Sequence, residues 1–221
     1  MMKDETKELD HPIFRESIHF IKSKLRVHNL DDLQEQVLLR LIHTSGDFKI
    51  GNLLNFSEDA CLKAVSALQK GAPILTDTSM ASAAISSMAA KIKKTQIFQI
   101  LDWVCNEDEI KGTKTELGME RAWIDLTDKF PKELSPLVVI GSSPTALNKL
   151  LDLISTGSQV PSLIVGMPVG FIGVAKSKKR LESMELEIPQ IRLDGSRGGA
   201  GCAASVVNAL IRAAIISSEE E

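Results

Sequence analysis

Apolar residues in the first seventy positions recur every three or four residues, the spacing at which side chains share one face of a helix. Three helices are predicted from this pattern, at residues 10–27, 29–45 and 57–70. Asp10 can cap the first helix, with Pro12 in its first turn, and Asn29 or Asp31 can start the second. The N-terminal third of the chain is therefore expected to be helical.

From residue 73 onward, short β-rich apolar runs alternate with segments of helical spacing. The runs are 73–76, 95–101, 137–140, 162–165 and 189–193, and the helical segments that follow them are 78–90, 115–130, 145–154, 176–186 and 199–216. Repetition of strand, loop and helix predicts an α/β fold with a largely parallel sheet covered by helices on both faces. No Pro- or Gly-rich linker divides the chain, so we expect one domain over 11–216, with a flexible tail at 1–10 and an acidic tail at 217–221.

The composition narrows the class of protein further. The 221 residues are 43% apolar and 25% charged, which excludes disordered and collagen-like chains, and the formal charge of −3 gives no bulk case for nucleic-acid binding. No apolar run approaches the ~18 residues needed to cross a bilayer, and no secretory signal is recognisable, so a cytoplasmic protein without a membrane partner is expected. Cys61, Cys105 and Cys202 form no CxxC pair, which predicts reduced, mostly buried thiols.

Ligands of parallel sheets bind beyond the carboxyl ends of the strands, so the loops that follow the strands hold the candidate contacts. Thr76 and Asp77 follow the first strand, where they can cap the next helix or face a ligand. Ser143 and Thr145 follow the run 137–140 at a predicted helix N-terminus. Free backbone N–H groups there suit a carboxylate or phosphate, and simple capping is the alternative.

The loop at 166–173 is apolar but contains three glycines and a proline, so it cannot continue a strand. Its central residues are Val169, Gly170 and Phe171. A bare apolar loop in this place suits a large, flat apolar ligand, or equally tight packing at an oligomer interface.

The last predicted strand is followed by a glycine-rich loop that contains Arg197, Gly198 and Gly199. Its backbone N–H groups and the bidentate guanidinium favour an anionic guest, although the small residues that follow also indicate close helix packing. The loop matches neither GxGxxG nor GxxxxGK[ST], which disfavours a dinucleotide site.

The sequence offers few groups that titrate near neutral pH, because it has four His and no Tyr. His11 and His28 lie at predicted helix ends, where exposure is expected, and His19 is flanked by apolar positions and could belong to the core. His43 closes the second helix. The helix C-terminus raises its pKa and Arg40, three residues earlier, lowers it, so either proton transfer or helix capping is open.

Ser17 lies on the apolar stripe of the first predicted helix, in register with Ile13, Ile21 and Leu25. A hydroxyl on such a stripe needs a partner. A backbone carbonyl is one possibility, and a ligand pocket is the other.

Five stretches together carry a family resemblance: RLIHTSGD, GAPILTDTSM, GSSPTAL, GMPVGFIGVAKSK and GSRGGAGCAASVVNAL. With these motifs in the family's order, over residues 11–210, the chain resembles the precorrin-8X methylmutase family, including its cobalt-precorrin-8 branch. The resemblance implies an α/β homodimer, without a cofactor or metal, that moves a methyl group from carbon 11 to carbon 12 of precorrin-8X or cobalt-precorrin-8. The products would be hydrogenobyrinate or cobyrinate, in cobalamin biosynthesis.

The same resemblance implies roles for individual residues. His43 falls at the family's catalytic histidine, Ser17 at a substrate-contact position, and Arg121 where the family usually has an arginine that can meet the substrate. The chain departs from the family at Ser142 and Ser143, where GNAPTAL is common, at Lys176, where ESK is common, at Ala84, where a Gly is expected, and at Glu120, where a Thr is frequent. These departures bear on the substrate contacts and on the preference for cobalt-loaded or metal-free substrate.

A corrin precursor is a wide apolar ring fringed with carboxylates, and the candidate loops fit such a ligand. We expect Val169, Gly170 and Phe171 to form an apolar shelf, and Arg40, Arg121, Arg197 and the helix starts at Thr145 and Gly199 to hold carboxylates, with Gly198 beside them. The hypothesis for the chemistry is that the His43 imidazolium hydrogen-bonds to or protonates a ring nitrogen. The competing functions are a corrinoid-binding protein without catalysis and a nucleotide- or S-adenosylmethionine-dependent enzyme on a similar fold.

Overall fold

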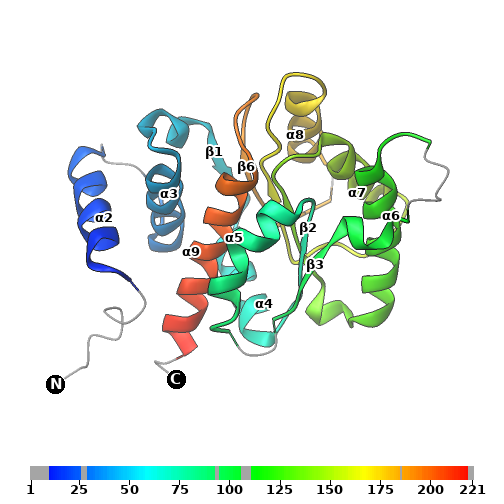
Figure 1. Cartoon of the computed structure of the whole chain (residues 1–221), viewed down its shortest axis with the longest axis horizontal. Coiled ribbons are helices and arrows are strands. Elements are labelled where there is room, and N and C mark those ends of the chain that lie inside the picture. The colour runs from blue at the N-terminus through cyan, green and yellow to red at the C-terminus, as the bar shows by residue number, and fades with distance from the viewer. Residues whose placement is uncertain (1–9, 26–28, 93–94, 106–110, 185, 219–221) are drawn as a thin grey trace.

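A six-stranded sheet runs through the middle of the molecule, with helices on both of its faces (Figure 1). The computed structural model describes residues 10–25, 29–92, 95–105, 111–184 and 186–218. The strands lie in the order β1 (Leu54–Phe56), β6 (Gln190–Leu193), β5 (Leu163–Gly166), β4 (Leu137–Ile140), β2 (Ile74–Thr76) and β3 (Ile97–Gln99). All neighbouring pairs are parallel except β1 with β6, which confirms the predicted largely parallel sheet.

The order of the strands changes direction between β2 and β4. The chain adds β3 outside β2, and then returns to place β4 on the other side of β2, followed by β5 and β6. β4 and β5 are fully buried, as continuous apolar runs in a parallel sheet should be. The crevice at such a switch point is the usual ligand site of this architecture, and it lies where the loops after β2 and β4 meet.

The helices form a layer on each face of the sheet, and each layer has its own apolar core. One face carries α3 (Asp32–Ser45), α4 (Ala60–Lys70), α5 (Ser79–Ala89) and α9 (Ala200–Ser218). The other face carries α6 (Lys114–Lys129), α7 (Pro144–Ser155) and α8 (Val174–Glu182). α2 (Pro12–Lys24) lies outermost, against α3 (Figure 1). Short 3-10 helices are η1 (Phe48–Leu53), η2 (Ile100–Trp103) and η3 (Lys132–Leu134).

The long C-terminal helix α9 is the central helix of its layer. It packs against α3, α4 and α5 and also reaches β4 and β5. Its run of small residues permits this close packing, because Ala203, Ala204 and Ser205 are all buried. By length and composition alone, α9 is long and apolar enough to cross a membrane. The lengths of continuous apolar runs in the sequence did not indicate this segment. Buried core helices of other proteins meet the same criteria, and α9 is mostly buried.

One strand was not predicted, one predicted strand was too long, and one predicted helix start was wrong. The antiparallel edge strand β1 was not predicted, because three half-buried residues give too short a pattern. The run 95–101 is a strand only over Ile97–Gln99 and then continues as η2. The third helix begins at Ala60 rather than Ser57, since the Ser57 hydroxyl accepts a hydrogen bond from the Gln190 backbone instead of capping a helix.

The start of α2 also differs from the prediction. His11, not Asp10, is the N-cap residue, with its Nδ1 accepting from the Ile13 backbone N–H at 3.3 Å. Asp10 is buried and pairs with Arg212 of α9, so it does not belong to a free tail. The helix ends at Lys24, before the predicted end at Val27, because Leu25 is extended. Val27 and His28 lie outside the described residues.

The predicted burial of His19 and of most of the cysteines was wrong. His19 is exposed on α2 and is not a core residue. Of the three free cysteines Cys61 is buried, Cys202 is intermediate and Cys105 is exposed, so the thiols are not mostly buried.

Candidate active site

His43 and Ser17 are hydrogen-bonded side chain to side chain. Nδ1 of His43, in the last turn of α3, lies 2.7 Å from the Ser17 hydroxyl oxygen on α2. The partner of the Ser17 hydroxyl is therefore the imidazole ring of His43, and not a backbone carbonyl. Within the described residues, Nε2 of His43 makes no hydrogen bond.

Phe14 lies between the imidazole of His43 and the guanidinium of Arg40. Its ring meets the imidazole edge-on, with centroids 4.9 Å apart and planes at 87°. The guanidinium carbon of Arg40 lies 4.5 Å from the centroid of the same ring, at cation–π distance. α2 thus supplies both the hydroxyl and the aromatic wall that surround the histidine.

The structure decides the direction of the pKa shift of His43. Partial burial is the largest cause and lowers the pKa, and the positive charge of Arg40 lowers it further. His43 is therefore mainly a neutral imidazole near pH 7 in the free protein.

The end of α3 is tied to the glycine-rich loop that follows β6. Asp47, one residue past the Gly46 C-cap of α3, accepts a hydrogen bond from Nη1 of Arg197 in an ion pair. The loop itself packs against the end of β5, because Gly199 N–H donates to the Met167 carbonyl at 2.9 Å. This contact places Arg197, Gly198 and Gly199 on the same edge of the molecule as the end of α3.

Lys178 of α8 holds the same loop, a role that its place in the motif GMPVGFIGVAKSK did not indicate. Its side chain is 1% exposed, and its Nζ donates to the carbonyls of Gly195 at 2.9 Å and Arg197 at 2.5 Å. Burial lowers the pKa of Lys178 to about 8. A buried lysine without a bonded carboxylate serves here as a support for backbone carbonyls.

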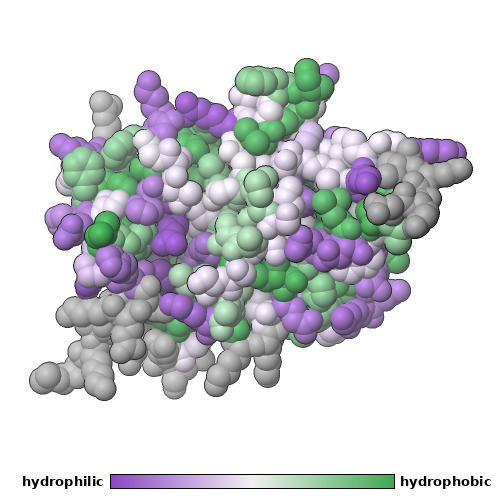
Figure 2. Space-filling view, in the orientation of Figure 1, coloured by the Kyte–Doolittle hydropathy of each residue, from purple (hydrophilic) through white to green (hydrophobic). Residues whose placement is uncertain are grey.

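The apolar loop before α8 protrudes from the surface. Phe171 and Ile172 are 91% and 89% exposed, and Val169 is 48% exposed. Figure 2 shows the corresponding apolar surface at the top of the view, above α8. Gly170 N–H donates to the Ser196 carbonyl at 3.1 Å, so this loop and the glycine-rich loop are neighbours.

At the β2–β4 switch point, Asp77 and Thr76 hydrogen-bond to the backbone of neighbouring segments. Both side chains are fully buried. Oδ2 of Asp77 accepts from the backbone N–H groups of Ser142 and Ser143, at 2.6 and 2.8 Å, and the Thr76 hydroxyl donates to the Phe98 carbonyl. Burial raises the pKa of the Asp77 carboxyl despite these N–H donors. That Thr76 and Asp77 contact the substrate stays a prediction.

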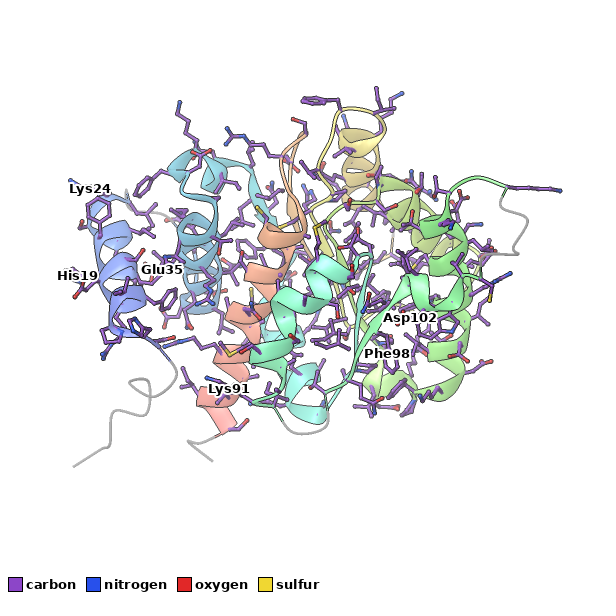
Figure 3. All side chains as sticks on the ribbon, viewed as in Figure 1. His19, Lys24, Glu35, Lys91, Phe98 and Asp102 are labelled. Atoms are coloured by element: carbon purple, nitrogen blue, oxygen red, sulfur yellow. The ribbon has the colours of Figure 1, made fainter. Side chains whose placement is uncertain are left out.

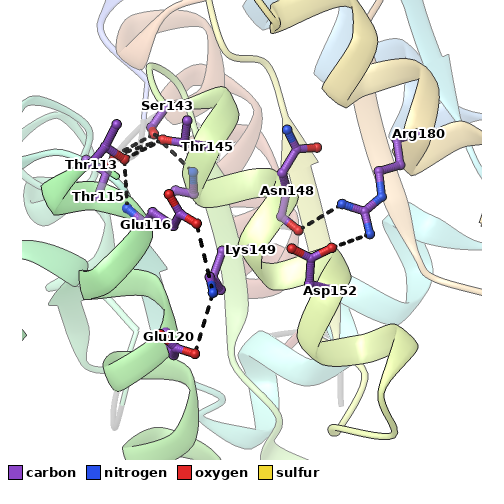
Figure 4. A network of polar contacts seen from close by, with 11 residues as sticks. Thr113, Thr115, Glu116, Glu120, Ser143, Thr145, Asn148, Lys149, Asp152 and Arg180 are labelled. Carbon is purple, nitrogen blue, oxygen red and sulfur yellow. Dashed lines mark hydrogen bonds and ion pairs between the residues drawn. The ribbon is translucent and has the colours of Figure 1, made fainter. Parts of the chain in front are cut away.

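Ser143 and Thr145 belong to a cluster of four hydroxyls at the starts of α6 and α7 (Figure 4). Ser143 caps α7 by accepting from the Ala146 N–H, and it also lies 2.7 Å from the Thr115 hydroxyl. The Thr145 hydroxyl lies 2.7 Å from that of Thr113, the N-cap residue of α6. Sequence reasoning missed Thr113 and Thr115, although a Thr three residues before Glu116 is a capping pattern that could have revealed them.

Arg121 is not brought near His43 within one chain. It lies on α6, and its Nη1 donates to the Trp103 carbonyl at 3.0 Å. Figure 3 shows the distance between the two regions: Glu35 of α3 is labelled at one end of the molecule, and Phe98 and Asp102, which precede Trp103, at the other. Two of the predicted substrate-binding residues, Ser17 and Arg40, do lie beside His43. A third, Arg197, lies just beyond the end of α3, where it pairs with Asp47.

The described residues contain no group of three or more His, Cys, Asp and Glu side chains placed to hold a metal ion. The arrangement around His43 instead offers one ionisable ring, one hydroxyl and two guanidinium groups. Those groups can orient an anionic ligand and exchange a proton with it.

The chain is similar to known proteins in both sequence and fold. The model of the precorrin-8X methylmutase family matches residues 12–213. The chain is 35% identical to a cobalt-precorrin-8 methylmutase of Synechocystis sp., over 92% of this chain and 95% of that one. It is 33% identical to a precorrin-8X methylmutase of Pseudomonas aeruginosa, over 90% and 93%.

The fold is similar to that of the precorrin-8X methylmutase of Thermus thermophilus, with a TM-score of 0.80. The sequences are 28% identical, and the match covers 93% of this chain and 96% of that one.

Proposed function

This chain belongs to the precorrin-8X methylmutase family, and on that premise we propose that it moves a methyl group from carbon 11 to carbon 12 of a precorrin-8 macrocycle, with His43 as the proton donor. It is an isomerase of the intramolecular-transferase class, acting in cobalamin biosynthesis. The methyl group stays within one molecule, so the reaction needs no separate methyl donor. Precorrin-8X would give hydrogenobyrinate, and cobalt-precorrin-8 would give cobyrinate.

The observation that carries the role of His43 is its hydrogen bond to Ser17. That bond occupies Nδ1 and orients the ring, so that Nε2 is the atom that meets a ring nitrogen of the substrate. Hydrogen bonding or proton transfer to that nitrogen draws electron density from the macrocycle and eases migration of the methyl group. General acid assistance is typically worth about 10²–10⁴-fold in rate.

Substrate binding itself favours the acid form of His43. In the free protein burial and Arg40 lower the pKa of this imidazole. A precorrin carries several carboxylates, and negative charge close to an imidazole stabilises its protonated form. The proton donor would thus be charged when the anionic substrate is present.

The rest of the ligand fits the loops around the end of α3. Arg40 and Arg197 supply guanidinium groups for carboxylates, with Gly198 and Gly199 exposing backbone beside Arg197. The starts of α7, at Ser143 and Thr145, and of α9, at Gly199, are further sites for carboxylates. Val169, Gly170 and Phe171 would support the apolar face of the macrocycle.

We also propose that the enzyme is a cytoplasmic homodimer. The highly exposed Phe171 and Ile172 support this proposal, because large apolar side chains at such exposure commonly mark an interface. Sedimentation equilibrium tests it: a single species of twice the 24.1 kDa chain mass is expected, and a stable monomer would overturn it.

A turnover assay tests the function. Purified protein is incubated with precorrin-8X and, separately, with cobalt-precorrin-8, and formation of the corrin chromophore is followed by absorption. We expect turnover of at least one substrate, and its loss in His43→Ala. His11→Asn serves as the matched control, since it replaces another histidine with a good helix cap. Turnover by His43→Ala at the wild-type rate would sink the proton-donor role.

The same assay separates the competing functions. A spectral perturbation of the bound precorrin without a corrin product would mark a binding protein. Calorimetric binding of S-adenosylmethionine or a nucleotide would favour the cofactor-dependent alternative.

A further inference from the structure

A cavity of about 340 Å³ lies between α2, α3 and α9, with Phe14 and Arg40, two neighbours of His43, in its wall. These three helices lie side by side at one end of the molecule (Figure 1). The lining residues are Asp10, Phe14, Arg15, Ile18, His19, Lys22, Gln36, Leu39, Arg40, Ala209 and Arg212. The strand-end loops at 169–173 and 195–199 take no part in it.

The wall of this cavity has an excess of positive charge. Arg15, Lys22, Arg40 and Arg212 contribute cations, and Asp10 is the one carboxylate among the lining residues. That carboxylate is already engaged, since Arg212 donates to it through Nε at 2.9 Å and Nη2 at 2.6 Å. Lys22 is paired with Glu35 at 2.6 Å.

Arg15 and Arg40 form no ion pair within the part of the chain that the structure describes. Arg40 is half-buried, and burial together with Arg212 disfavours its charge, which Asp10 only partly offsets. An arginine keeps its proton in proteins, so a further anion beside it would stabilise this charge. Asp10, which Arg212 already engages, is the one negative group that the cavity wall offers Arg40.

The shape of the wall indicates the kind of anion. Ile18, Leu39 and Ala209 form apolar parts of the wall, while the cations surround them. A carboxylate on a short hydrocarbon stem would satisfy both, because the stem covers the apolar atoms and the carboxylate meets the guanidinium groups. A bare inorganic ion would leave the apolar wall uncovered.

Arg40 is shared between this cavity and the histidine. The groups that face His43 are Ser17 and Phe14 from α2 and Arg40 from its own helix, and the Asp47–Arg197 pair beyond the helix end neutralises itself. Of these, Arg40 is the one whose charge disfavours the imidazolium. A negative group beside Arg40 would offset that effect.

We propose that the cavity between α2, α3 and α9 binds a carboxylate on a short alkyl stem, and that its occupation favours the imidazolium form of His43. The second half rests on the proposed function, since it concerns the proton donor. The carboxylate could be an acetate or propionate arm of the macrocycle or a free small carboxylate, and both present the same chemistry to Arg40.

Succinate is the probe for binding, measured by calorimetry on the full-length protein. We expect binding to wild type and at least tenfold weaker binding to Ala209→Leu, which fills the cavity without removing a charge. Arg15→Gln is the second variant, and it should also weaken succinate binding because it removes a cation from the cavity wall. It keeps the test valid if the leucine of Ala209→Leu disturbs the packing of the helices. Arg180→Gln is the matched control, since Arg180 lies on α8 outside the cavity and should leave affinity unchanged. No binding to wild type, or equal binding to all four proteins, would overturn the site.

The coupling to His43 is measured by NMR titration of the imidazole C2 proton. We expect saturating succinate to move the His43 titration to higher pH in wild type and to leave it unmoved in Ala209→Leu at the same concentration. Binding of succinate with no movement of the His43 titration would overturn the coupling.

The turnover assay separates the two sources of the carboxylate. Competitive inhibition by succinate indicates that an arm of the substrate occupies the cavity, whereas activity extended to higher pH by succinate indicates a free carboxylate. No effect of succinate on turnover would overturn the coupling. Succinate binding is also measured on His43→Ala. If only the proposed catalytic role is wrong, this variant binds succinate as wild type does and turns over substrate at the wild-type rate.

Discussion

Nδ1 of His43 lies 2.7 Å from the hydroxyl oxygen of Ser17, a residue twenty-six positions earlier in the chain. A serine hydroxyl can donate to a neutral imidazole nitrogen and can accept from an imidazolium N–H. The same pair can thus hold the ring in one orientation before and after it loses a proton. This is the property that a proton donor in a methyl migration requires.

Ser17→Ala tests that positioning role. Loss of a hydrogen bond worth about 0.5–1.5 kcal/mol should lower kcat by roughly twofold to twelvefold, with a smaller change in KM. Ser17→Thr retains the hydroxyl and should recover most of the rate. Steady-state kinetics on both variants decide the matter, and equal kcat for Ser17→Ala and wild type would contradict it.

The pH dependence of the reaction should follow the lowered pKa of His43. In the proposed mechanism the imidazolium is the active form, so kcat/KM should fall as the pH rises through a free-enzyme pKa that lies below the ordinary 6.5. Arg40→Met removes one of the two causes, so it should shift the NMR titration of His43 to higher pH, while Arg180→Met should not. An Arg40→Met titration that coincides with wild type would show that Arg40 has no influence on the ring.

Asp77 should act on stability rather than on substrate. Asp77→Ala leaves the buried N–H groups of Ser142 and Ser143 unpaired, and we expect a loss of about 2–4 kcal/mol in the free energy of unfolding. Asp77→Asn keeps an acceptor oxygen and should stay within ~1 kcal/mol of wild type at pH 7. Urea unfolding measures both, and an Asn variant as unstable as the Ala variant would contradict the hydrogen-bond explanation.

The raised pKa of Asp77 adds a pH signature. The folded carboxyl keeps its proton to higher pH than the unfolded carboxyl, whose pKa is 3.8, so wild type should gain stability relative to Asp77→Asn as the pH falls toward that value. A difference between the two proteins that is constant with pH would argue against it.

Lys178 should give the protein an alkaline signature. The folded ammonium loses its proton near pH 8, whereas the unfolded one keeps it up to 10.5, so the unfolded state binds more protons in this window and stability should rise with pH. At about 1.4 kcal/mol per pKa unit the gain is on the order of 3 kcal/mol. The difference in unfolding free energy between wild type and Lys178→Met should therefore grow from pH 8 to 10.5, and Lys179→Met, at an exposed position of the same helix, should show no such trend.

Gly198 should tolerate no side chain. Its φ is +156°, and a Cβ atom would lie 2.0 Å from the Met167 carbonyl oxygen, in backbone that cannot move aside. We expect Gly198→Ala to lose about 2–4 kcal/mol of stability. Gly201→Ala is the control, because a Cβ there meets nothing within 4 Å, and a helical alanine is favoured by up to ~1 kcal/mol. Equal melting temperatures for the two variants would contradict the steric argument.

The sequence alone determined the order of the elements from residue 73 on and the family to which the chain belongs. Continuous apolar runs such as Leu137–Ile140 and glycine after the ends of α3 and α4 are local signals, and they are read without knowledge of the partner segments. The motif around His43 singled out the same residue that the structure surrounds with a hydroxyl and a guanidinium. Local patterns therefore sufficed for the scaffold and for choosing His43 as the candidate proton donor.

Only the tertiary structure decided what each candidate side chain does. Burial and hydrogen bonding showed Thr76 and Asp77 as supports of neighbouring backbone, set the direction of the pKa shift of His43, and revealed Lys178 as a support of the glycine-rich loop. Each of these outcomes depends on segments that are far apart in the chain and meet only in the fold. Solvation and electrostatic fields are set by those neighbours, so the pattern along the chain cannot supply them.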